Sequence, residues 1–270
     1  MFFADYHVHT NFSFDSDTLA EPEKCVERAI ELGMDEIAVT DHLDFKYCTL
    51  EAFPYIDLKR YAVEIPRIKE KYKKEINVVF GLELGPHIGN VHLVDSLTVQ
   101  YPFDFIICST HDIKGLGIWD DNAFFIGKTK RESHEEYLNE VLAVIKAAPN
   151  YNVYGHIDYL DRYGLYEDKN LYYSEHAEIV DEIFKSLISA GKGIEINTSG
   201  YRYGLPYATP KLEFLRRYRE LGGEIITIGS DAHSIETIGY KFGEARETLL
   251  SAGFKYITSF SGLKPTMRPI

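Results

Sequence analysis

The 270-residue chain has few cysteines and no long apolar segment. The three cysteines, Cys25, Cys48 and Cys108, are scattered and odd in number, which argues against a disulfide framework or a zinc ribbon and predicts reduced thiols in a cytoplasmic protein. No run reaches the roughly 18 apolar residues that a membrane helix needs. No basic segment precedes Asp5 near the start of the sequence, so we expect no secretory signal.

Basic residues are also few, since 29 Lys and Arg face 42 Asp and Glu, which gives a net charge of −13. Binding along nucleic acid needs basic side chains that replace counterions, so we expect no nucleic-acid partner. A hydrophobic content of 45% and a charged content of 26% are typical of a globular enzyme and argue against disorder. The chain is rich in histidine instead, with ten histidines among many acids, which directs attention to metal sites.

Short runs rich in β-branched and aromatic residues alternate with longer amphipathic segments. The predicted strands are residues 2–8, 36–40, 77–82, 103–108, 152–154, 193–196 and 224–228, with an optional eighth at 256–260. The predicted helices are residues 21–32, 133–147, 174–190, 210–221 and 241–251. This alternation predicts an α/β fold, and the length suits one closed barrel over residues 1–270. An open doubly wound sheet is the alternative, although no G-x-G-x-x-G follows the first strand.

Two connections are longer than usual, at residues 43–72, whose second half has a helical pattern, and at residues 112–130. Long connections in compact domains often act as lids over a site, although a plain surface excursion fits equally well. The second connection contains Trp119, the only tryptophan, together with Asp120 and Asp121, a mixture that suits a pocket wall.

Histidines and acids follow six of the predicted strands. In chain order they are His7 and His9, Asp41 and His42, Glu83, His111 and Asp112, His156 and Asp158, and Asp231 and His233. The carboxyl ends of all strands in a parallel barrel face one mouth, where active sites form. Residues two apart in extended backbone point the same way, so each H-x-H or D-x-H pair can aim at one ion. Imidazole and carboxylate bind zinc, iron or manganese, and the coincidence of six groups predicts a metal site.

The roles of some of these residues stay open on spacing alone. Asp41, Asp112 and Asp158 suit either metal ligation or the hydrogen bond that fixes an imidazole. His134 and His176 lie in charge-rich helical segments, where we expect them to be solvated.

As an ordered set of motifs, the chain resembles the PHP (polymerase and histidinol phosphatase) family. The matching motifs are H-x-H at His7 and His9, Asp15, T-D-H ending at His42, Glu83, His111, G-H-x-D from Gly155 to Asp158, and S-D-x-H from Ser230 to His233. They span residues 5–233, and the two long connections resemble the histidinol-phosphatase branch. The resemblance implies a distorted (β/α)7 TIM-like barrel with the active site at the C-terminal ends of its strands.

The resemblance also implies three divalent metal ions, which are zinc, iron or manganese. Carried over by motif, the ligands are His7, His9, Glu83 and Asp231 for the first ion, Glu83 as a bridge with His111 and His156 for the second, and Asp15, His42 and His233 for the third. Position 15 is a histidine in some branches, so Asp15 makes the third ion the most open of the three. On spacing alone, Asp15 equally suits a helix cap.

The activity that the resemblance implies is that of a histidinol-phosphatase, which hydrolyses L-histidinol phosphate to L-histidinol and phosphate in L-histidine biosynthesis. Multinuclear sites suit phosphate esters because metals lower the pKa of a bound water and clamp the phosphoryl oxygens. We expect a hydroxide that bridges the first two ions to attack phosphorus directly. Arg162 and Arg202 match, by loop and local order, arginines that this branch places on the phosphate.

Two further roles follow from this chemistry. Asp158 or a metal-bound water is the candidate that protonates the leaving alcohol. The substrate carries positive charge beside its phosphate, so Asp112, Asp120 and Asp121 are candidates for holding its amine or imidazole.

Two other functions remain open at this point. One is a PHP phosphoesterase that acts on nucleotides or other small phosphate esters, which the acidic charge does not exclude. The other is a metal-bound module without catalysis, against which the intact set of ligands argues.

Overall fold

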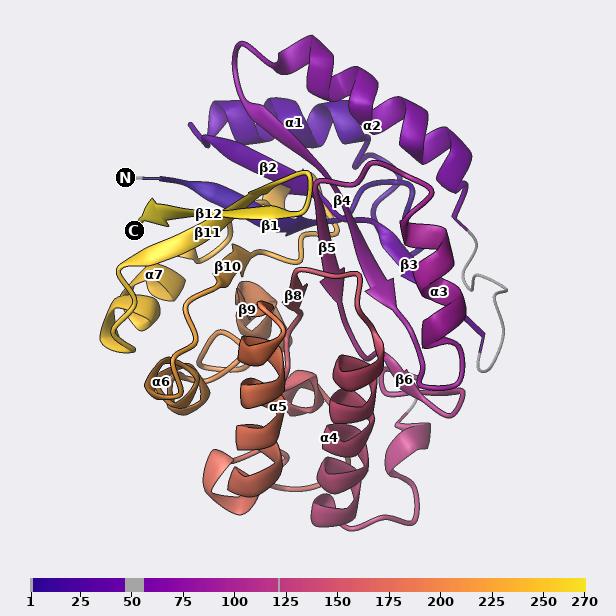
Figure 1. Ribbon diagram of the computed structural model, residues 1–270, viewed down its shortest axis with the longest axis vertical. Helices are drawn as coiled ribbons and strands as arrows, with labels where there is room; N and C mark the ends of the chain where they lie inside the picture. Colours follow the sequence, from indigo (N-terminus) through magenta and orange to yellow (C-terminus); the bar gives the residue numbers. More distant parts are fainter. Residues whose placement is uncertain (1, 47–55, 121) are drawn as a thin grey trace.

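Seven parallel strands form a nearly closed barrel in the computed structural model, which describes residues 2–46, 56–120 and 122–270 (Figure 1). In sheet order they are β1 (Ala4–Val8), β2 (Glu36–Val39), β4 (Asn77–Gly85), β5 (Phe105–Cys108), β8 (Val153–Tyr154), β9 (Gly193–Asn197) and β10 (Ile226–Gly229). The barrel closes where the main-chain N–H of His9 donates to the carbonyl of Ala232 at 2.8 Å. This confirms the predicted (β/α)7 TIM-like barrel. Cys48 and Asp121 lie outside the described residues.

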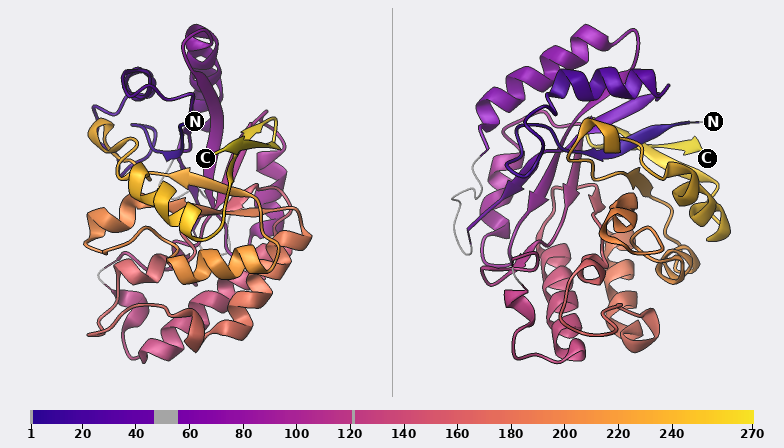
Figure 2. Two further views of the ribbon diagram at one scale, coloured as in Figure 1. Left: turned by 90° about the vertical axis from the view of Figure 1, so that its left-hand side faces the viewer. Right: turned by 180° about the vertical axis from the view of Figure 1, so that it is seen from behind.

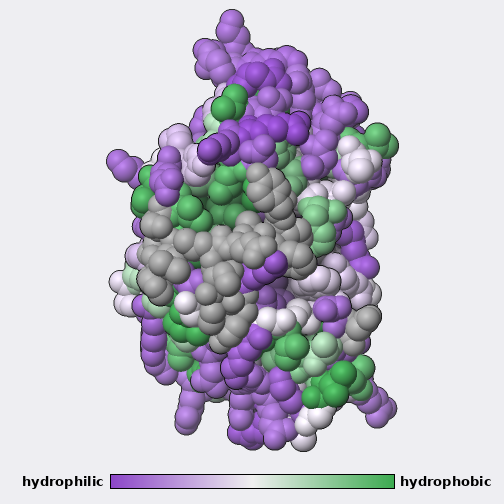
Figure 3. All heavy atoms as spheres, turned by 90° about the vertical axis from the view of Figure 1, so that its right-hand side faces the viewer, coloured by the Kyte–Doolittle hydropathy of each residue, from purple (hydrophilic) through white to green (hydrophobic). Residues whose placement is uncertain are grey.

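The helices surround the strands on all sides (Figures 1 and 2). They are α1 (Pro22–Glu31), α2 (Leu58–Tyr72), α3 (Val91–Thr98), α4 (Lys130–Ala147), α5 (Ala177–Ser189), α6 (Leu212–Glu220) and α7 (Phe242–Ser251). In α1, Cys25, Val26 and Ala29 recur at helical spacing and are buried against the sheet side, as the amphipathic pattern predicts. The upper part of the molecule, where α1 and α2 lie, presents mostly hydrophilic side chains to solvent (Figure 3). Within the described ranges, no helix has both the length and the apolar character to cross a membrane.

Several short elements were not predicted. Strand β3 (His42–Asp44) pairs with β4 in the first long connection, and β6 (Asp112–Ile113) pairs with β7 (Leu116–Gly117) in the second. The optional eighth strand exists as β11 (Tyr256–Ser261), but it pairs antiparallel with β12 (Lys264–Pro269) instead of joining the barrel. The chain ends lie side by side, and the N–H of Phe2 donates to the carbonyl of Pro269 (Figures 1 and 2).

The β11–β12 hairpin closes the end of the barrel opposite the carboxyl ends of the strands. Phe260 of β11 enters the apolar cluster formed by the first halves of the strands, with its ring 5.0 Å from that of Phe105 and 6.2 Å from that of Tyr6. Its main-chain N–H donates to the Tyr6 hydroxyl at 2.7 Å. The Phe260 side chain therefore fills the interior of the barrel at this end.

This packing predicts that Phe260→Ala destabilises the protein without impairing the site. Removing a buried phenylalanine costs about 3–5 kcal/mol, so the free energy of unfolding in urea should fall by that amount. Met267→Ala, at a more exposed position of the same hairpin, is the control and should change stability by less than about 1 kcal/mol. Equal losses in the two variants would contradict the role given to Phe260.

Candidate metal centre

Glu83 lies at the centre of a cluster of histidines at the open end of the barrel. Its carboxylate belongs to β4 and is fully buried. Five histidines surround it, each with a ring nitrogen 3.0–3.4 Å from a carboxylate oxygen: His7, His9, His42, His111 and His156. These histidines come from or directly follow β1, β3, β5 and β8, so one carboxylate connects the ends of most of the barrel strands.

Two further carboxylates complete the cluster. Asp231, after β10, places Oδ1 3.4 Å from His9 Nε2. Asp15 places Oδ2 3.2 Å from His233 Nε2 and 3.6 Å from His42 Nε2. The structure therefore brings all nine predicted ligands together, from segments up to 226 residues apart in the chain, since His7 and His233 both take part.

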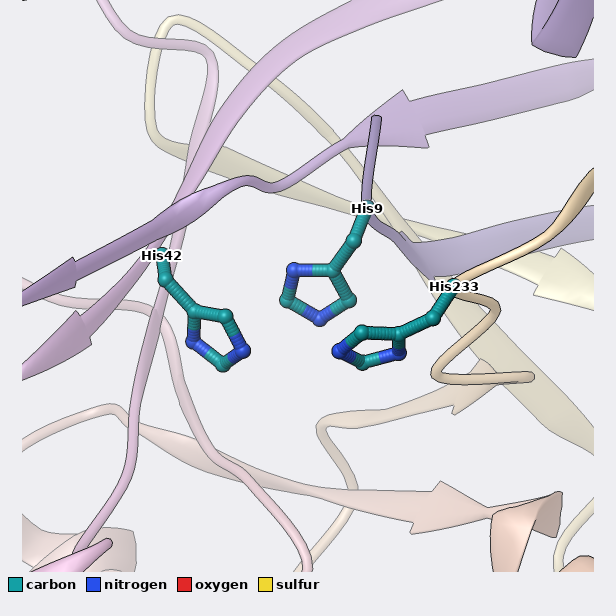
Figure 4. A group of neighbouring side chains, drawn as sticks. All are labelled: His9, His42 and His233. Atoms are coloured by element: carbon teal, nitrogen blue, oxygen red, sulfur yellow. The ribbon is translucent and has the colours of Figure 1, made fainter. Parts of the chain in front are cut away.

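The rings of His9, His42 and His233 gather around one space from three different elements (Figure 4). The centroid of the His9 ring is 4.2 Å from that of His42 and 4.2 Å from that of His233. Three more groups of three bring their donor atoms within 4.8 Å of one another: His7, Glu83 and His156; His7, His9 and Asp231; His42, Glu83 and His111. The groups share members, as expected where neighbouring ions share ligands. One group joins His42 to Glu83 and His111, whereas the family pattern assigns His42 to the third ion and Glu83 to the first two.

A bulge in β1 helps to aim His7 into the mouth. Between Asp5 and Val8 the register of β1 against β2 shifts by one residue. Such a bulge changes which face a side chain points to. Tyr6 consequently lies in the apolar interior while its neighbour His7 contacts Glu83, although adjacent residues of a regular strand face opposite sides.

The outer nitrogen of several imidazoles is held by the protein, which leaves the inner nitrogen for an ion. His7 Nδ1 lies 2.6 Å from Glu195 Oε1, and His111 Nδ1 lies 2.7 Å from Asp44 Oδ1. His9 Nδ1 has Ser13 Oγ at 3.2 Å. A partner on one ring nitrogen fixes the tautomer and the orientation of a ligating histidine.

The donor atoms fit divalent cations. Buried atoms without a hydrogen-bond partner among the described residues include Nε2 of His7, Nε2 of His9, Nδ1 of His42 and Oε2 of Glu83. Unsatisfied polar atoms at this depth are costly, and four of them close together fit the binding of a positively charged ion. Imidazole nitrogen and carboxylate oxygen are the donors that zinc and similar ions accept in proteins.

The electrostatics also fit the binding of positive charge. Burial lowers the pKa of His7, but Glu195, Glu83 and Asp231 outweigh it and hold the pKa well above its usual value. Burial raises the pKa of Glu83, yet His7, His111 and His42 hold it well below its usual range. The carboxylates thus stay ionised and favour protonation of His7, His42 and His111, a positive charge that metal ions would supply instead.

Arg162 is buried beside the cluster, at the end of the 3₁₀ turn Tyr159–Arg162. Its Nη2 donates to Ser199 Oγ at 2.6 Å, to Asp231 Oδ2 at 3.2 Å and to Asn197 Oδ1 at 3.3 Å. Its guanidinium also lies 4.9 Å from the centre of the Tyr159 ring. The cation is therefore fixed next to a candidate ligand by several contacts.

Arg202 holds the turn that presents Asp231. Its two terminal nitrogens donate to the carbonyls of Ser230 at 2.8 Å and of Asp231 at 2.6 Å. Asp231 has a φ of 54°, a left-handed conformation that a residue other than glycine adopts only when its surroundings compensate for the strain. The two hydrogen bonds from Arg202 supply part of that compensation.

A cavity of about 590 Å³ opens over the cluster. Both arginines line it, as do Asp112 and Asp120 of the second long connection and the aromatic residues Trp119, Tyr159, Tyr163 and Tyr203. The connection is thus part of a pocket wall, as its composition predicts. Asp112 also lies 3.1 Å from His87 Nε2, so its carboxylate has a protein partner on one side of the cavity.

Two predicted residues do not reach the cavity. Asp158 is fully buried, accepts a hydrogen bond from the N–H of Lys211 at 3.1 Å, and has Lys211 Nζ at 3.5 Å. Burial raises the pKa of Asp158 and the Lys211 ammonium offsets part of this rise. Because Asp158 does not line the pocket, it is a poor candidate for protonating the leaving alcohol. Asp41 accepts from Thr10 and Ser13 and supports the loop after β1 instead of an ion.

Two expectations about other residues need correction or addition. His134 and His176 were expected to be solvated, but they are only 1% and 6% exposed. Charge-rich helix sequences do not reveal that another segment covers them. Asp44 was not predicted at all, yet it contacts both His111 and His42, which lower its pKa to about 2 against the opposing effect of burial. Its place two residues after His42 in extended backbone was the available signal.

Glu195 on β9 offers a test of the support that surrounds the cluster. It contacts His7 through Oε1 and accepts from the N–H of His156 through Oε2. Glu195→Gln should lower kcat/KM for phosphate-ester hydrolysis by about 10- to 100-fold, as is usual when the partner of a ligating histidine is lost. Glu224→Gln, an exposed position just before β10, is the control and should leave turnover unchanged. Full activity in Glu195→Gln would show that His7 needs no such partner.

The sequence matches the PHP domain family over residues 5–199. The chain belongs to the PHP family. The PHP match ends before β10, yet Asp231 and His233, which follow that strand, are part of the cluster. The site therefore extends beyond the matched segment.

Relatives match over nearly the whole chain. A histidinol-phosphatase from Lactococcus lactis is 36% identical over 265 residues, which cover 96% of this chain and 95% of the relative. A protein from Clostridium acetobutylicum named "Probable histidinol-phosphatase" is 32% identical and covers 89% of this chain and 90% of its own. The crystal structure of histidinol phosphate phosphatase from Lactococcus lactis, complexed with zinc, L-histidinol and phosphate, aligns with a TM-score of 0.88 at 35% identity over 98% of both chains.

Proposed function

We propose that the protein is a histidinol-phosphatase, a metal-dependent phosphoric monoester hydrolase that converts L-histidinol phosphate to L-histidinol and phosphate in L-histidine biosynthesis. The observation that carries this proposal is the match, over 98% of both chains, to a structure that holds zinc, L-histidinol and phosphate. The cluster of histidines and carboxylates under a cavity of about 590 Å³ supplies the matching chemistry in this chain.

Three divalent ions, which are zinc, iron or manganese, would be held by His7, His9, Asp15, His42, Glu83, His111, His156, Asp231 and His233. When bound, such ions lower the pKa of a coordinated water and neutralise the oxygens of a phosphoryl group. The chain's own part is to fix these donors before substrate arrives. Glu195, Asp44 and Ser13 do so by holding the outer nitrogens of His7, His111 and His9.

Arg162 and Arg202 would serve the phosphate. Both line the cavity beside Asp231, and a guanidinium offers paired donors that match phosphoryl oxygens. Arg162 is held by Ser199, Asn197 and Asp231, so its side chain loses little conformational freedom when substrate binds. Asp158 acts through Arg162 in this scheme, because its contact with Lys211 fixes the start of the turn that ends in Arg162.

Asp112 and Asp120 would hold the cationic end of the substrate. They line the same cavity as the two arginines and carry the opposite charge, so the cavity offers both cationic and anionic side chains to a ligand. A molecule with a phosphate at one end and an amine and imidazole at the other fits this polarity. Neutral substitutions at both acids that left kcat/KM unchanged would remove them from the proposal.

The proposed enzyme comprises residues 1–270 as a single PHP metallophosphoesterase domain, since β10 and the residues after it close the barrel against β1. A cytoplasmic location is proposed with it, because Cys25 and Cys108 are free thiols. We expect no nucleic-acid partner, given the net charge of −13.

Steady-state phosphate release from a panel of esters tests the function. The panel contains L-histidinol phosphate, nucleoside monophosphates and p-nitrophenyl phosphate, each with the same metal-loaded protein. We expect kcat/KM for L-histidinol phosphate to exceed that for every nucleotide by at least about 100-fold, because only that substrate in the panel joins a phosphate for the arginines to a cationic end for Asp112 and Asp120. Faster turnover of a nucleotide would overturn the assignment and favour a nucleotide phosphoesterase.

A further inference from the structure

A second group of possible metal donors lies away from the cavity. It consists of His134 in the first turns of α4, Glu175 at the end of the 3₁₀ turn Tyr173–Glu175, and His176, the residue before α5. One donor atom from each lies within 4.8 Å of the others. None of the three lines the cavity over the histidine cluster. The group therefore joins the beginnings of two neighbouring helices and has no part in the proposed reaction.

His134 has the properties of a histidine prepared to bind an ion. Its side chain is only 1% exposed, and its Nδ1 has no hydrogen-bond partner among the described residues. The ring also forms a hydrogen bond with the main chain of Lys169, as ligating histidines usually do with the nitrogen that faces away from the metal. Burial, with His176 and Lys130 nearby, lowers the pKa of His134 to about 4, so the imidazole is neutral at pH 7.

The second imidazole lies beside the first, with the ring centroids of His134 and His176 5.5 Å apart and the ring planes at 63° to each other. His176 is also buried, and burial lowers its pKa. Two buried neutral imidazoles whose nitrogens lie this close would repel each other if protonated. In their neutral form, the two imidazoles can coordinate one cation that accepts nitrogen lone pairs.

Glu175 supplies the negative charge. It is exposed, and its Oε2 lies 3.4 Å from Lys130 Nζ, which also donates to Asp168 at 3.0 Å. A divalent ion that took the place of Lys130 at Glu175 would leave the lysine its bond to Asp168. Lys130 would therefore still have a carboxylate partner after an ion had replaced it beside Glu175.

We propose that His134, Glu175 and His176 form a structural zinc site that ties the start of α4 to the start of α5. Two imidazole nitrogens, one carboxylate oxygen and a water complete the tetrahedral set that zinc prefers.

Zinc content tests the proposal. The full chain and its variants are equilibrated at a series of buffered free-zinc concentrations, and bound zinc per chain is measured by plasma mass spectrometry. Glu175→Ala and His176→Asn should each bind one zinc fewer than the unmodified protein, with kcat/KM for L-histidinol phosphate within about twofold. Glu178→Gln, an exposed acid in the first turn of α5, is the matched control and should bind as much zinc as the unmodified protein.

Two results would overturn the proposal. One is an equal zinc content in Glu175→Ala and the unmodified protein at every free-zinc concentration. The other is a loss of zinc that is accompanied by a proportional loss of activity, since the missing ion would then belong to the mouth of the barrel. Glu175 is exposed, so its replacement keeps the fold and the test does not depend on the buried histidines alone.

Discussion

Glu83→Gln is expected to lower kcat/KM for L-histidinol phosphate by about 1,000-fold, which corresponds to about 4 kcal/mol of transition-state stabilisation. Glutamine has nearly the same shape, but its amide nitrogen cannot coordinate a metal ion and the side chain carries no charge. The Glu83 carboxylate lies within 3.4 Å of five histidines, so the change removes charge from the middle of the cluster. Elemental analysis should show fewer bound ions in the same sample.

The control for this variant is Glu75→Gln, an exposed position just before β4 that should leave both turnover and metal content unchanged. Thermal unfolding of Glu83→Gln must remain cooperative, so that lost activity reports on the site and not on the fold. Activity within tenfold of the unmodified protein, together with a full complement of metal, would contradict the central place given to Glu83.

Arg162→Lys is expected to lower kcat/KM by about 100-fold, because truncating one partner of a buried, hydrogen-bonded charge pair typically costs 2–5 kcal/mol. Lysine keeps the positive charge, but its shorter side chain does not carry a nitrogen to the position of Arg162 Nη2, which donates to Ser199, Asn197 and Asp231. The remaining carboxylate of Asp231 then has a poorer partner and a less fixed position beside the proposed ions.

Arg217→Lys is the matched control, because Arg217 makes a similar arginine–aspartate pair with Asp181 at the surface, far from the cavity lining. Exposed pairs contribute little, so this variant should keep turnover within twofold. If both lysine variants behaved alike in steady-state assays of phosphate release, Arg162 would have no special role in binding phosphate.

The strand ends could be read from the sequence because two independent patterns coincide there. Short β-branched runs predict strands such as 77–82, and the polar residue that follows, such as Glu83, predicts where the mouth lies. A parallel barrel brings all such ends together whatever their spacing in the chain, so the convergence of His7 with His233 needs only the topology.

Other features depend on tertiary contacts that leave no local pattern. The burial of His134 and His176 results from packing between α4 and α5, while their own segments look solvated. Asp158 and Asp231 have the same chemistry and both follow strands. Asp158 nevertheless contacts Lys211, whereas Asp231 lies beside His9, because the cavity lies on only one side of the loops that carry them.

The short strand β3, which carries Asp44 to His111, is likewise set by its pairing with β4 and not by its own three residues. The β11–β12 hairpin shows the same limit, since the run at 256–260 predicts a strand but not the partner that keeps it out of the barrel.

Removal and return of metal tests the central claim most directly. The full chain is treated with a chelator until elemental analysis finds no zinc, iron or manganese, and phosphate release from L-histidinol phosphate is then measured before and after each ion is added back. We predict that hydrolysis is lost on depletion and is restored by at least one of these divalent ions. Undiminished hydrolysis by protein verified to be free of metal would contradict the assignment of the histidine cluster as the active site.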